Sequence, residues 1–420
     1  MPSNFTLYIS YTYPIKFPHQ NYFENIPPCN TYPFLELKTF VSKYKKLLSL
    51  TSSHFCTHIV LSFLASVMPS RVSDSLALHP VFQHNHNQYL DLNSLEELPD
   101  SHAWSSELDK LSASPDDHGE SNLPVIDLSD PINGPKHLVH ACKTWGAFQL
   151  INHGISNQLV DSMEAATRKL FSLPIEQKLK AERQEGGCGY GPFRISSFFP
   201  KRMWSEGFTI VGSPLQHARL LWPEDYSVFC DVTEEYQKEM KKLAGKIMWI
   251  MLEALGITKE DIIWAGPNGE FEASGAALQL NSYPVCPDPD RAMGLADHTD
   301  STLLSILHQS NQSGLQVFRE EMGWVTVPPV EGALVVNIGD LLHILTNGSY
   351  PSVLHRVTVN RERHRYSMAY LYGPPHSAEI SPLSKLVDHQ HPPLYRPVTW
   401  SEYLGMKAIL FYNALSSLRL

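Results

Sequence analysis

The feature of this sequence that most constrains its fold is a series of short apolar segments between residues 276 and 374. Each segment runs for about six to eight residues and ends near Pro, Gly or Asn, which is typical of β-strands joined by turns. No helix-length segment separates them, so a parallel sheet with helical crossovers is disfavoured. The sequence predicts an antiparallel sandwich or barrel from segments 276–285, 303–309, 314–320, 323–330, 333–345, 352–360 and 365–374.

Helical patterns dominate the part of the chain that precedes these strands. Amphipathic helices are predicted over 135–145 and 156–172, with Ser156 as the N-cap of the second. Short strands are predicted within "LPVIDLSD" and at "AFQLIN". The longest predicted helix is "TEEYQKEMKKLAGKIMWIMLEALGI", whose Met and Trp residues indicate a face buried in the core. The predicted fold class is mainly β with flanking α, with an N-terminal helical region before the β-rich core.

The N-terminal part of the chain differs in amino-acid composition from the rest. Nine of the 21 residues between Leu47 and Val67 are Ser, Thr or His, whereas a membrane-spanning helix needs about 20 mostly apolar residues. We expect residues 1–67 to be a disordered or mis-annotated leader that the folded domain does not need, because the "MPS" of Met1 recurs at Met68. The regions that follow are a polar arm over 68–121 with a short helix near Leu92 to Leu98, the helical and strand region 122–270, the β-rich core 271–376 and the C-terminal segment 377–420.

Charge and cysteine content narrow the classes of partner. The 420-residue chain has a formal net charge of -10, which disfavours non-specific nucleic-acid binding, because neutralising phosphates needs a dense Lys and Arg surface. Its 6 cysteines show no C-x-x-C pairing, which indicates a reducing compartment without a zinc ribbon. We therefore expect a cytoplasmic protein that acts on a small molecule and does not bind nucleic acid. We also expect a monomer that binds no membrane, with the nucleus as a second location.

A histidine and a carboxylate lie two positions apart in "GLADHTDSTLLSILHQ", residues 294–309. On an extended strand, residues i and i+2 point to the same face, so His298 and Asp300 present an imidazole and a carboxylate to one point. The segment "SVLHRVTVN" supplies His355 as a third ligand. Two histidines and one carboxylate form a facial triad with open coordination positions, which suits non-haem Fe(II) and oxygen chemistry. These three residues are the predicted metal ligands and catalytic centre.

A lone His-x-Asp pair is weak evidence, because it also occurs by chance in cores and surface loops. Two further polar pairs strengthen the interpretation. "RYS" places Arg365 and Ser367 on one strand face, where a guanidinium fork and a hydroxyl suit a carboxylate. "LNSYP" places Asn281 and Tyr283 in the same relation. A buried arginine without an anionic partner is costly, so three polar pairs on the strands of one small barrel indicate a lined functional interior.

At these residues the chain resembles the plant 2-oxoglutarate- and Fe(II)-dependent dioxygenases, from about Leu123 to the C-terminus. The motifs that carry the resemblance are "WGAFQLINHG", "NSYPVCPDPD", "HTD", "GLQVF", "NIGDLLHILTNG", "LHRV" and "RYSMAYLYGP". The resemblance implies a double-stranded β-helix of the jelly-roll or cupin-like type, with Fe(II) at the three ligands. It also implies that Arg365, Ser367 and Tyr283 hold 2-oxoglutarate beside Asn281, that O2 is a cosubstrate and that ascorbate is an activator.

Within this family, three stretches are similar to the gibberellin 3-beta-dioxygenases: 189–210, 292–320 and 372–408. The similarity implies hydroxylation of a gibberellin precursor at its 3-beta position, which yields a bioactive hormone, succinate and CO2. Such a substrate is a rigid apolar diterpenoid with a carboxylate, so its pocket should be apolar and aromatic with one cation. The candidate substrate-binding residues are Arg194, Phe198, Phe199 and Trp204.

Other functions are compatible with the same motifs. A gibberellin dioxygenase acting at carbon 2 or carbon 20 uses the same iron chemistry, and a jelly-roll protein without catalysis binds a small molecule as a receptor. Two residues also depart from the family pattern: Asp297 stands where a small apolar residue is usual, and His308 stands where a phenol is usual. We expect Asp297 to face away from the metal, because neighbours on a strand point to opposite faces.

Overall fold

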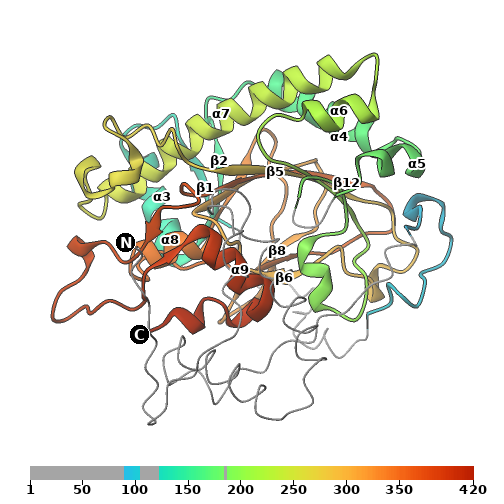
Figure 1. The fold of residues 1–420 in the computed structure, drawn as a ribbon. Coiled ribbons are helices and arrows are strands. Elements are labelled where there is room, and N and C mark those ends of the chain that lie inside the picture. Colours follow the sequence, from blue (N-terminus) through green and yellow to red (C-terminus); the bar gives the residue numbers. More distant parts are fainter. Residues whose placement is uncertain (1–88, 105–122, 184–186) are drawn as a thin grey trace, which may run out of the picture. The chain divides into compact units, whose positions relative to one another are not determined.

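The computed structural model describes residues 89–104, 123–183 and 187–420 (Figure 1). The predicted leader over 1–67 lies outside these residues, as does most of the predicted arm over 68–121. The β-rich core and the C-terminal segment lie entirely within them.

The described part of the arm forms little regular structure. The helix predicted near Leu92 to Leu98 is wrong for most of its length, because only a 3-10 turn over Leu92–Ser94 forms. The Asp91 side chain accepts a hydrogen bond from the Asn93 backbone N–H at 3.1 Å. Such a local bond favours a turn over a continuing helix.

The helices predicted in the N-terminal region are present, with small changes at their ends. The longest begins at Tyr226 instead of the predicted Thr233. Ser156 occupies the N-cap of its helix, but its side chain makes no capping hydrogen bond. The helices are α3 (Asn133–Thr144), α4 (Asn157–Phe171), α5 (Ile175–Lys178), α6 (Leu215–Leu221), α7 (Tyr226–Glu253), α8 (Asp340–Leu345) and α9 (Trp400–Leu410).

Within the described residues, an eight-stranded sheet has the order β1-β2-β10-β7-β12-β5-β4-β3, and a four-stranded sheet has the order β6-β11-β8-β9. Neighbouring strands run antiparallel, except that β1 and β2 are parallel. The strands are β1 (Val125–Asp127), β2 (Ala147–Ile151), β3 (Gly189–Gly191), β4 (Glu206–Ile210), β5 (Ala276–Tyr283), β6 (Leu295–His298), β7 (Leu304–Gln309), β8 (Leu315–Arg319), β9 (Gly323–Thr326), β10 (Leu334–Ile338), β11 (His355–Val357), β12 (Arg365–Tyr372), and the separate pair β13 (Glu379–Ile380) and β14 (Val398–Thr399).

The two larger sheets pack face to face around a shared interior. Ala147 and Leu307 of the eight-stranded sheet meet Leu295 and Val317 of the four-stranded sheet in one buried apolar cluster. In Figure 1, β6 and β8 lie below β5 and β12. This arrangement is the double-stranded β-helix, or jelly roll, and the predicted fold class is confirmed.

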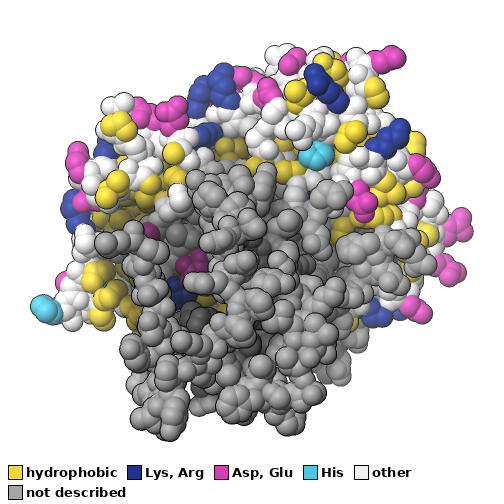
Figure 2. All heavy atoms as spheres, viewed as in Figure 1, with side chains coloured by type: hydrophobic (Ala, Val, Ile, Leu, Met, Phe, Trp, Pro, Cys, Tyr) yellow, Lys and Arg dark blue, Asp and Glu magenta, His cyan; other side chains and the backbone are white. Residues whose placement is uncertain are grey.

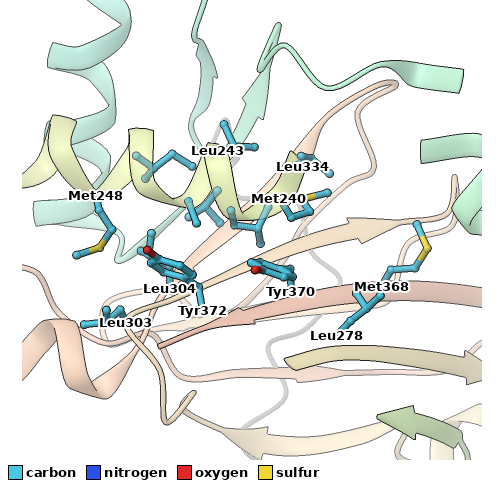
Figure 3. Close-up of a cluster of buried hydrophobic side chains, with 14 of the residues drawn as sticks. Met240, Leu243, Met248, Leu278, Leu303, Leu304, Leu334, Met368, Tyr370 and Tyr372 are labelled. Carbon is cyan, nitrogen blue, oxygen red and sulfur yellow. The ribbon is translucent and has the colours of Figure 1, made fainter. Parts of the chain in front are cut away.

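Helix α7 covers the outer face of the eight-stranded sheet. Its buried residues recur every three or four positions, as expected for an amphipathic helix with one face on a core. Figure 3 shows Met240, Leu243 and Met248 of this helix beside Tyr370 and Tyr372 of β12. The sheet therefore has an outer face packed against helices and an inner face turned toward the jelly-roll interior.

The region 122–270 also contributes strands to this sheet. It supplies β1, β2, β3 and β4. Of these, β2 pairs with β10 and β4 pairs with β5 of the core region 271–376, while β1 and β3 extend the two edges of the sheet. One sheet therefore runs across the boundary that the sequence predicts near residue 271.

Segment 333–345, predicted as one strand, is a strand followed by a helix. β10 ends at Ile338 and α8 begins at Asp340. Gly339 lies between the strand and the helix, where the chain passes close to the Thr302 carbonyl oxygen. A Cβ at this position would clash with that oxygen, so glycine fits here. All residues of α8 except His343 are buried, so the helix has no exposed polar face and its sequence shows no helical period.

The surface of the described residues carries charges of both signs. On the face shown in Figure 2, Lys and Arg side chains are interspersed with Asp and Glu side chains. Among the described residues visible on that face, positive side chains form no extended patch, in keeping with the formal net charge of -10. None of the helices among the described residues is long and apolar enough to cross a bilayer.

A buried ion pair fastens α5 to the outer face of the sheet. Lys178 Nζ donates to Glu206 Oε1 at 2.5 Å, and the two side chains are 4% and 6% exposed. The Tyr190 hydroxyl donates to the same oxygen at 2.5 Å. Because both charges are desolvated, each depends on its partner to offset the cost of burial.

We expect Lys178→Ala to lower the free energy of unfolding by about 3 to 5 kcal/mol, because it leaves Glu206 buried without its cation. Urea denaturation measures the change. Lys238→Ala is the control, since Lys238 and Glu235 form an exposed pair at 3.0 Å, and its loss should change stability by less than about 1 kcal/mol. Equal losses in the two variants would contradict this account of the buried pair.

Candidate active site

Two paired strands of the smaller sheet position the predicted metal ligands. His298 at the end of β6 and His355 at the start of β11 are direct partners in the antiparallel register. Asp300 lies beyond the end of β6, so irregular backbone places it, and not the strand alternation that the sequence suggests. Its Oδ1 is 3.7 Å from His298 Nε2 and 3.8 Å from His355 Nε2. The structure therefore brings the three predicted ligands together.

Backbone carbonyls fix the orientation of both imidazoles. His298 Nδ1 lies 2.8 Å from the Ala296 carbonyl oxygen, and His355 Nδ1 lies 3.2 Å from the Val353 carbonyl oxygen. A carbonyl oxygen can only accept, so each Nδ1 carries a proton. In this tautomer the lone pair is on Nε2, the atom that faces Asp300, and this is how proteins commonly orient histidine ligands.

Burial and neighbouring charge set the protonation of this cluster. Burial, and then the adjacent His355, lower the pKa of His298 to about 4, so His298 is neutral at pH 7. Burial raises the pKa of Asp300, but the two histidines outweigh that effect and hold the pKa below its usual range. Two imidazoles and one carboxylate thus offer ligand atoms that all lie within 4.8 Å of one another.

These residues fit an Fe(II) ion. Asp300 Oδ2 is buried and has no hydrogen-bond partner among the described residues, as expected of an atom whose partner is a metal. Two imidazole nitrogens and one carboxylate oxygen form the donor set of non-haem Fe(II) oxygenases and leave coordination positions open.

The predicted carboxylate site lies on the inner face of the larger sheet. In the register of β12 with β5, Arg365 is opposite Tyr283 and Ser367 is opposite Asn281. Asn281 Nδ2 donates to Ser367 Oγ at 3.1 Å, and the Arg365 guanidinium lies 5.1 Å from the centre of the Tyr283 ring. All four predicted residues therefore meet at one place.

Arg365 is only 1% exposed, and its bonds leave part of the guanidinium without a partner. Nε donates to the Gln312 carbonyl oxygen at 3.3 Å, and Nη2 donates to Gln309 Oε1 at 3.2 Å. Arg365 Nη1 and Gln309 Nε2 are buried and have no partner among the described residues. Burial lowers the pKa of Arg365. A desolvated cation beside two unused N–H donors fits a carboxylate ligand, so Gln309 is a site residue that the sequence analysis missed.

Two family profiles and several close relatives match this chain. Residues 274–374 match the 2OG-Fe(II) oxygenase superfamily, and residues 123–226 match the profile described as non-haem dioxygenase in morphine synthesis N-terminal. Gibberellin 3-beta-dioxygenase 1 of Pisum sativum is 58% identical, over 84% of this chain and 94% of its own length. The chain belongs to the 2-oxoglutarate- and Fe(II)-dependent dioxygenases. Gibberellin 3-beta-dioxygenase 2 of Arabidopsis thaliana is 54% identical, over 84% of this chain and 100% of its own length.

Solved structures agree with this membership. The crystal structure of JOX2 in complex with 2OG, Fe and JA has a TM-score of 0.66 and 32% identity, and the match covers 78% of this chain and 95% of that chain. The rice dioxygenase for auxin oxidation has a TM-score of 0.59 and 25% identity, and the match covers 71% of this chain and 100% of that chain. Fe(II) and 2-oxoglutarate are therefore the cofactor and cosubstrate of this dioxygenase, as the sequence predicts.

The predicted substrate-binding residues of the dioxygenase fall into two groups. Phe198 and Phe199 pack with the apolar cluster of the jelly-roll interior. Trp204 belongs to a different cluster, with Leu92 and Cys286, and its indole N–H donates to the Pro284 carbonyl oxygen at 3.1 Å. The structure does not bring Trp204 to the other two. The side chain of Arg194 lies outside what the structure describes, so its assignment stays a prediction.

Phe411 is a further aromatic residue of this region that the sequence analysis missed. Its ring stacks on Phe198 with centroids 4.5 Å apart and meets Phe199 edge-on at 5.6 Å. Phe411 follows α9 and has a φ of 44°, a left-handed conformation that is unfavourable for a bulky residue and is often found at functional sites. Its position depends on how the C-terminal segment packs against the interior, and no local sequence pattern reports that packing.

The two departures from the family pattern have partners of their own. Asp297 precedes the first ligand, and its Oδ2 accepts a hydrogen bond from the Tyr412 hydroxyl at 2.9 Å. His308 Nε2 lies 2.7 Å from Glu164 Oε2 of α4, on the outer face of the sheet. The hydrogen bond from His308 lowers the pKa of Glu164 to about 2. His308 therefore fastens α4 to the sheet on the face opposite the site.

We expect His355→Ala to weaken Fe(II) binding by at least about 100-fold, because only two of the three ligands remain. Even substitutions of residues that hydrogen-bond to metal ligands lower metal affinity by about 10- to 100-fold. Anaerobic titration of the metal-free protein with Fe(II), followed by calorimetry, measures the affinity. His308→Ala should leave it unchanged, since that imidazole faces α4. Wild-type affinity in His355→Ala would remove this residue from the metal site.

For Arg365→Lys we expect the KM for 2-oxoglutarate to rise by about 10- to 100-fold, because an ammonium cannot reproduce the bidentate fork. The KM for the organic substrate should change by less than about threefold, since Arg365 is assigned to the other ligand. Initial rates measured while each substrate is varied in turn separate the two constants. Similar increases in both would mean that Arg365 supports the fold of the site instead of holding the cosubstrate.

Proposed function

We propose that this dioxygenase is a gibberellin 3-beta-dioxygenase. It hydroxylates a gibberellin precursor at the 3-beta position while 2-oxoglutarate and O2 are converted to succinate and CO2. The observation that carries the substrate assignment is the 58% identity to the Pisum sativum gibberellin 3-beta-dioxygenase over 94% of that enzyme's length. The buried His298, Asp300 and His355 cluster supports the reaction class.

The residues of the chain divide the chemistry between them. Bound Fe(II) supplies the activation of O2 that is coupled to oxidative decarboxylation of 2-oxoglutarate. His298, Asp300 and His355 would hold the ion, and three protein ligands would leave coordination positions for the reactants. Arg365, with Ser367, binds the carboxylate of the cosubstrate that is remote from the metal. One oxygen atom of O2 enters succinate and the other enters the hydroxyl group of the product, so no further reductant is consumed in a coupled turnover.

The aromatic residues beside the jelly-roll interior suit an apolar substrate. The Phe411 ring contacts both Phe198 and Phe199, and Phe199 is 7% and Phe411 1% exposed. Stacked rings present a rigid apolar surface with little conformational entropy to lose when a polycyclic diterpenoid binds. We assign these three rings to the wall of the substrate site. We assign Arg194 to the binding of the substrate's carboxylate.

A receptor without catalysis is the weaker alternative. Such a protein has no need for two buried histidines around an ionised carboxylate, or for a buried arginine with an unused N–H donor. These groups are costly to bury unless a metal and an anion bind them. A hydroxylase of a different carbon uses the same groups, so the position of hydroxylation is the property to measure.

We expect the purified protein, incubated with Fe(II), ascorbate, 2-oxoglutarate and a nineteen-carbon gibberellin precursor, to form a 3-beta-hydroxylated gibberellin. Mass spectrometry and comparison with standards identify the product, and succinate should form in equal amount. Asp300→Ala is the control and should form neither compound. A product hydroxylated only at carbon 2 would contradict the assignment and indicate a hormone-inactivating enzyme, and binding without any succinate would favour the receptor.

A further inference from the structure

One buried carboxylate lies behind the metal cluster and takes no part in the chemistry described above. Asp340, the first residue of α8, is 0% exposed. Its Oδ2 accepts hydrogen bonds from Thr299 Oγ1 at 2.9 Å, the Tyr403 hydroxyl at 2.7 Å and Lys407 Nζ at 2.8 Å. Its Oδ1 accepts from Ser352 Oγ at 2.7 Å. Every bond joins Asp340 to a segment distant in sequence or across a loop.

Two of these partners belong to the segments that carry the metal ligands. Thr299 stands between His298 and Asp300, and Ser352 lies shortly before His355 in the chain. The backbone N–H of Asp340 also donates to the Asp300 carbonyl oxygen at 2.8 Å. A single side chain thus holds both ligand-bearing segments, and its own backbone holds the segment of the carboxylate ligand.

The other two partners belong to the C-terminal helix α9. Lys407 Nζ is shared between Asp340 and Thr299 Oγ1, the latter at 2.6 Å, and its side chain is 12% exposed. A buried carboxylate needs a cation or several hydrogen bonds to offset its desolvation, and Asp340 has both. The C-terminal helix therefore supplies the charge that lets a carboxylate stay behind the metal site.

We propose that Asp340 is a positioning residue of the metal centre. It sets the separation of the Thr299 and Ser352 segments, and so the distance between Asp300 and the two imidazoles, while Lys407 balances its charge. The inference rests on the proposed function only in taking His298, Asp300 and His355 as the Fe(II) site. Hydrogen bonds behind metal ligands commonly contribute 10- to 100-fold to metal affinity by fixing ligand geometry.

The test is the affinity for metal alone, measured by anaerobic titration of metal-free protein with Fe(II) and, in parallel, with Mn(II). We expect Asp340→Ala to weaken binding by about 10- to 100-fold. Asp340→Asn keeps the shape and an accepting oxygen, so it should recover part of the affinity. Ser352→Ala removes one hydrogen bond and should weaken binding by about 2- to 10-fold. This variant provides the test if Asp340→Ala does not fold.

Glu206→Gln is the matched control. Glu206 is also a buried carboxylate with a lysine and a tyrosine as partners, but it lies on the outer face of the sheet, and its side chain bonds to neither ligand-bearing segment. We expect Asp340→Asn and Glu206→Gln both to lower the melting temperature of the metal-free protein, and only the Asp340 variants to lose metal affinity.

Two results overturn the inference. Wild-type affinity in the folded Asp340 variants and in Ser352→Ala would show that Asp340 is merely structural, and an equal loss in Glu206→Gln would show that any destabilised variant binds metal weakly. Failure of the wild-type protein to bind Fe(II) would overturn the proposed function together with the inference. Binding of Fe(II) without hydroxylation of a gibberellin would overturn the proposed function and leave the role of Asp340 standing.

Discussion

The pairing of β6 with β11 is the constraint on which the rest of the site depends. It sets His298 opposite His355, with ring centroids 4.3 Å apart, and burial together with the adjacent imidazole lowers the pKa of His298. Asp300 then supplies the negative charge, and an ion of double positive charge completes the cluster. Without such an ion, the unpartnered Asp300 Oδ2 is an uncompensated cost of folding.

The two faces of the eight-stranded sheet perform different tasks. The outer face packs against α7 and α4 through apolar residues and carries polar links that are internally satisfied, such as Lys178 with Glu206 and His308 with Glu164. On the inner face, Arg365 Nη1 and Gln309 Nε2 have no partner within the described part of the chain. Successive side chains along each strand point to opposite faces of the sheet. Residues that stabilise the fold are therefore close in sequence to residues that bind ligands.

The sequence predicts the site residues that follow a strand period. Arg365 with Ser367, and Asn281 with Tyr283, are i, i+2 pairs on strands that prove to be neighbours, so local alternation places each pair correctly. The helix α8 is not predicted, because a helix buried on all sides shows no period. Asp340, Lys407 and Phe411 also escape prediction, since each acts through contacts between distant segments. Trp204 lies in a suggestive aromatic stretch, but its ring packs into another cluster, and local sequence does not encode that choice.

The central claim is that one interior holds Fe(II) and 2-oxoglutarate together, with the histidine cluster on one sheet and Arg365 on the other. Visible absorption of the anaerobic Fe(II)-loaded protein during titration with 2-oxoglutarate tests it most directly, because a 2-oxo acid that chelates Fe(II) produces a charge-transfer band. We expect a band that saturates with 2-oxoglutarate and that does not form when Zn(II) replaces Fe(II). No band at saturating 2-oxoglutarate, in protein that binds both components, would show that they occupy separate sites and would contradict the account.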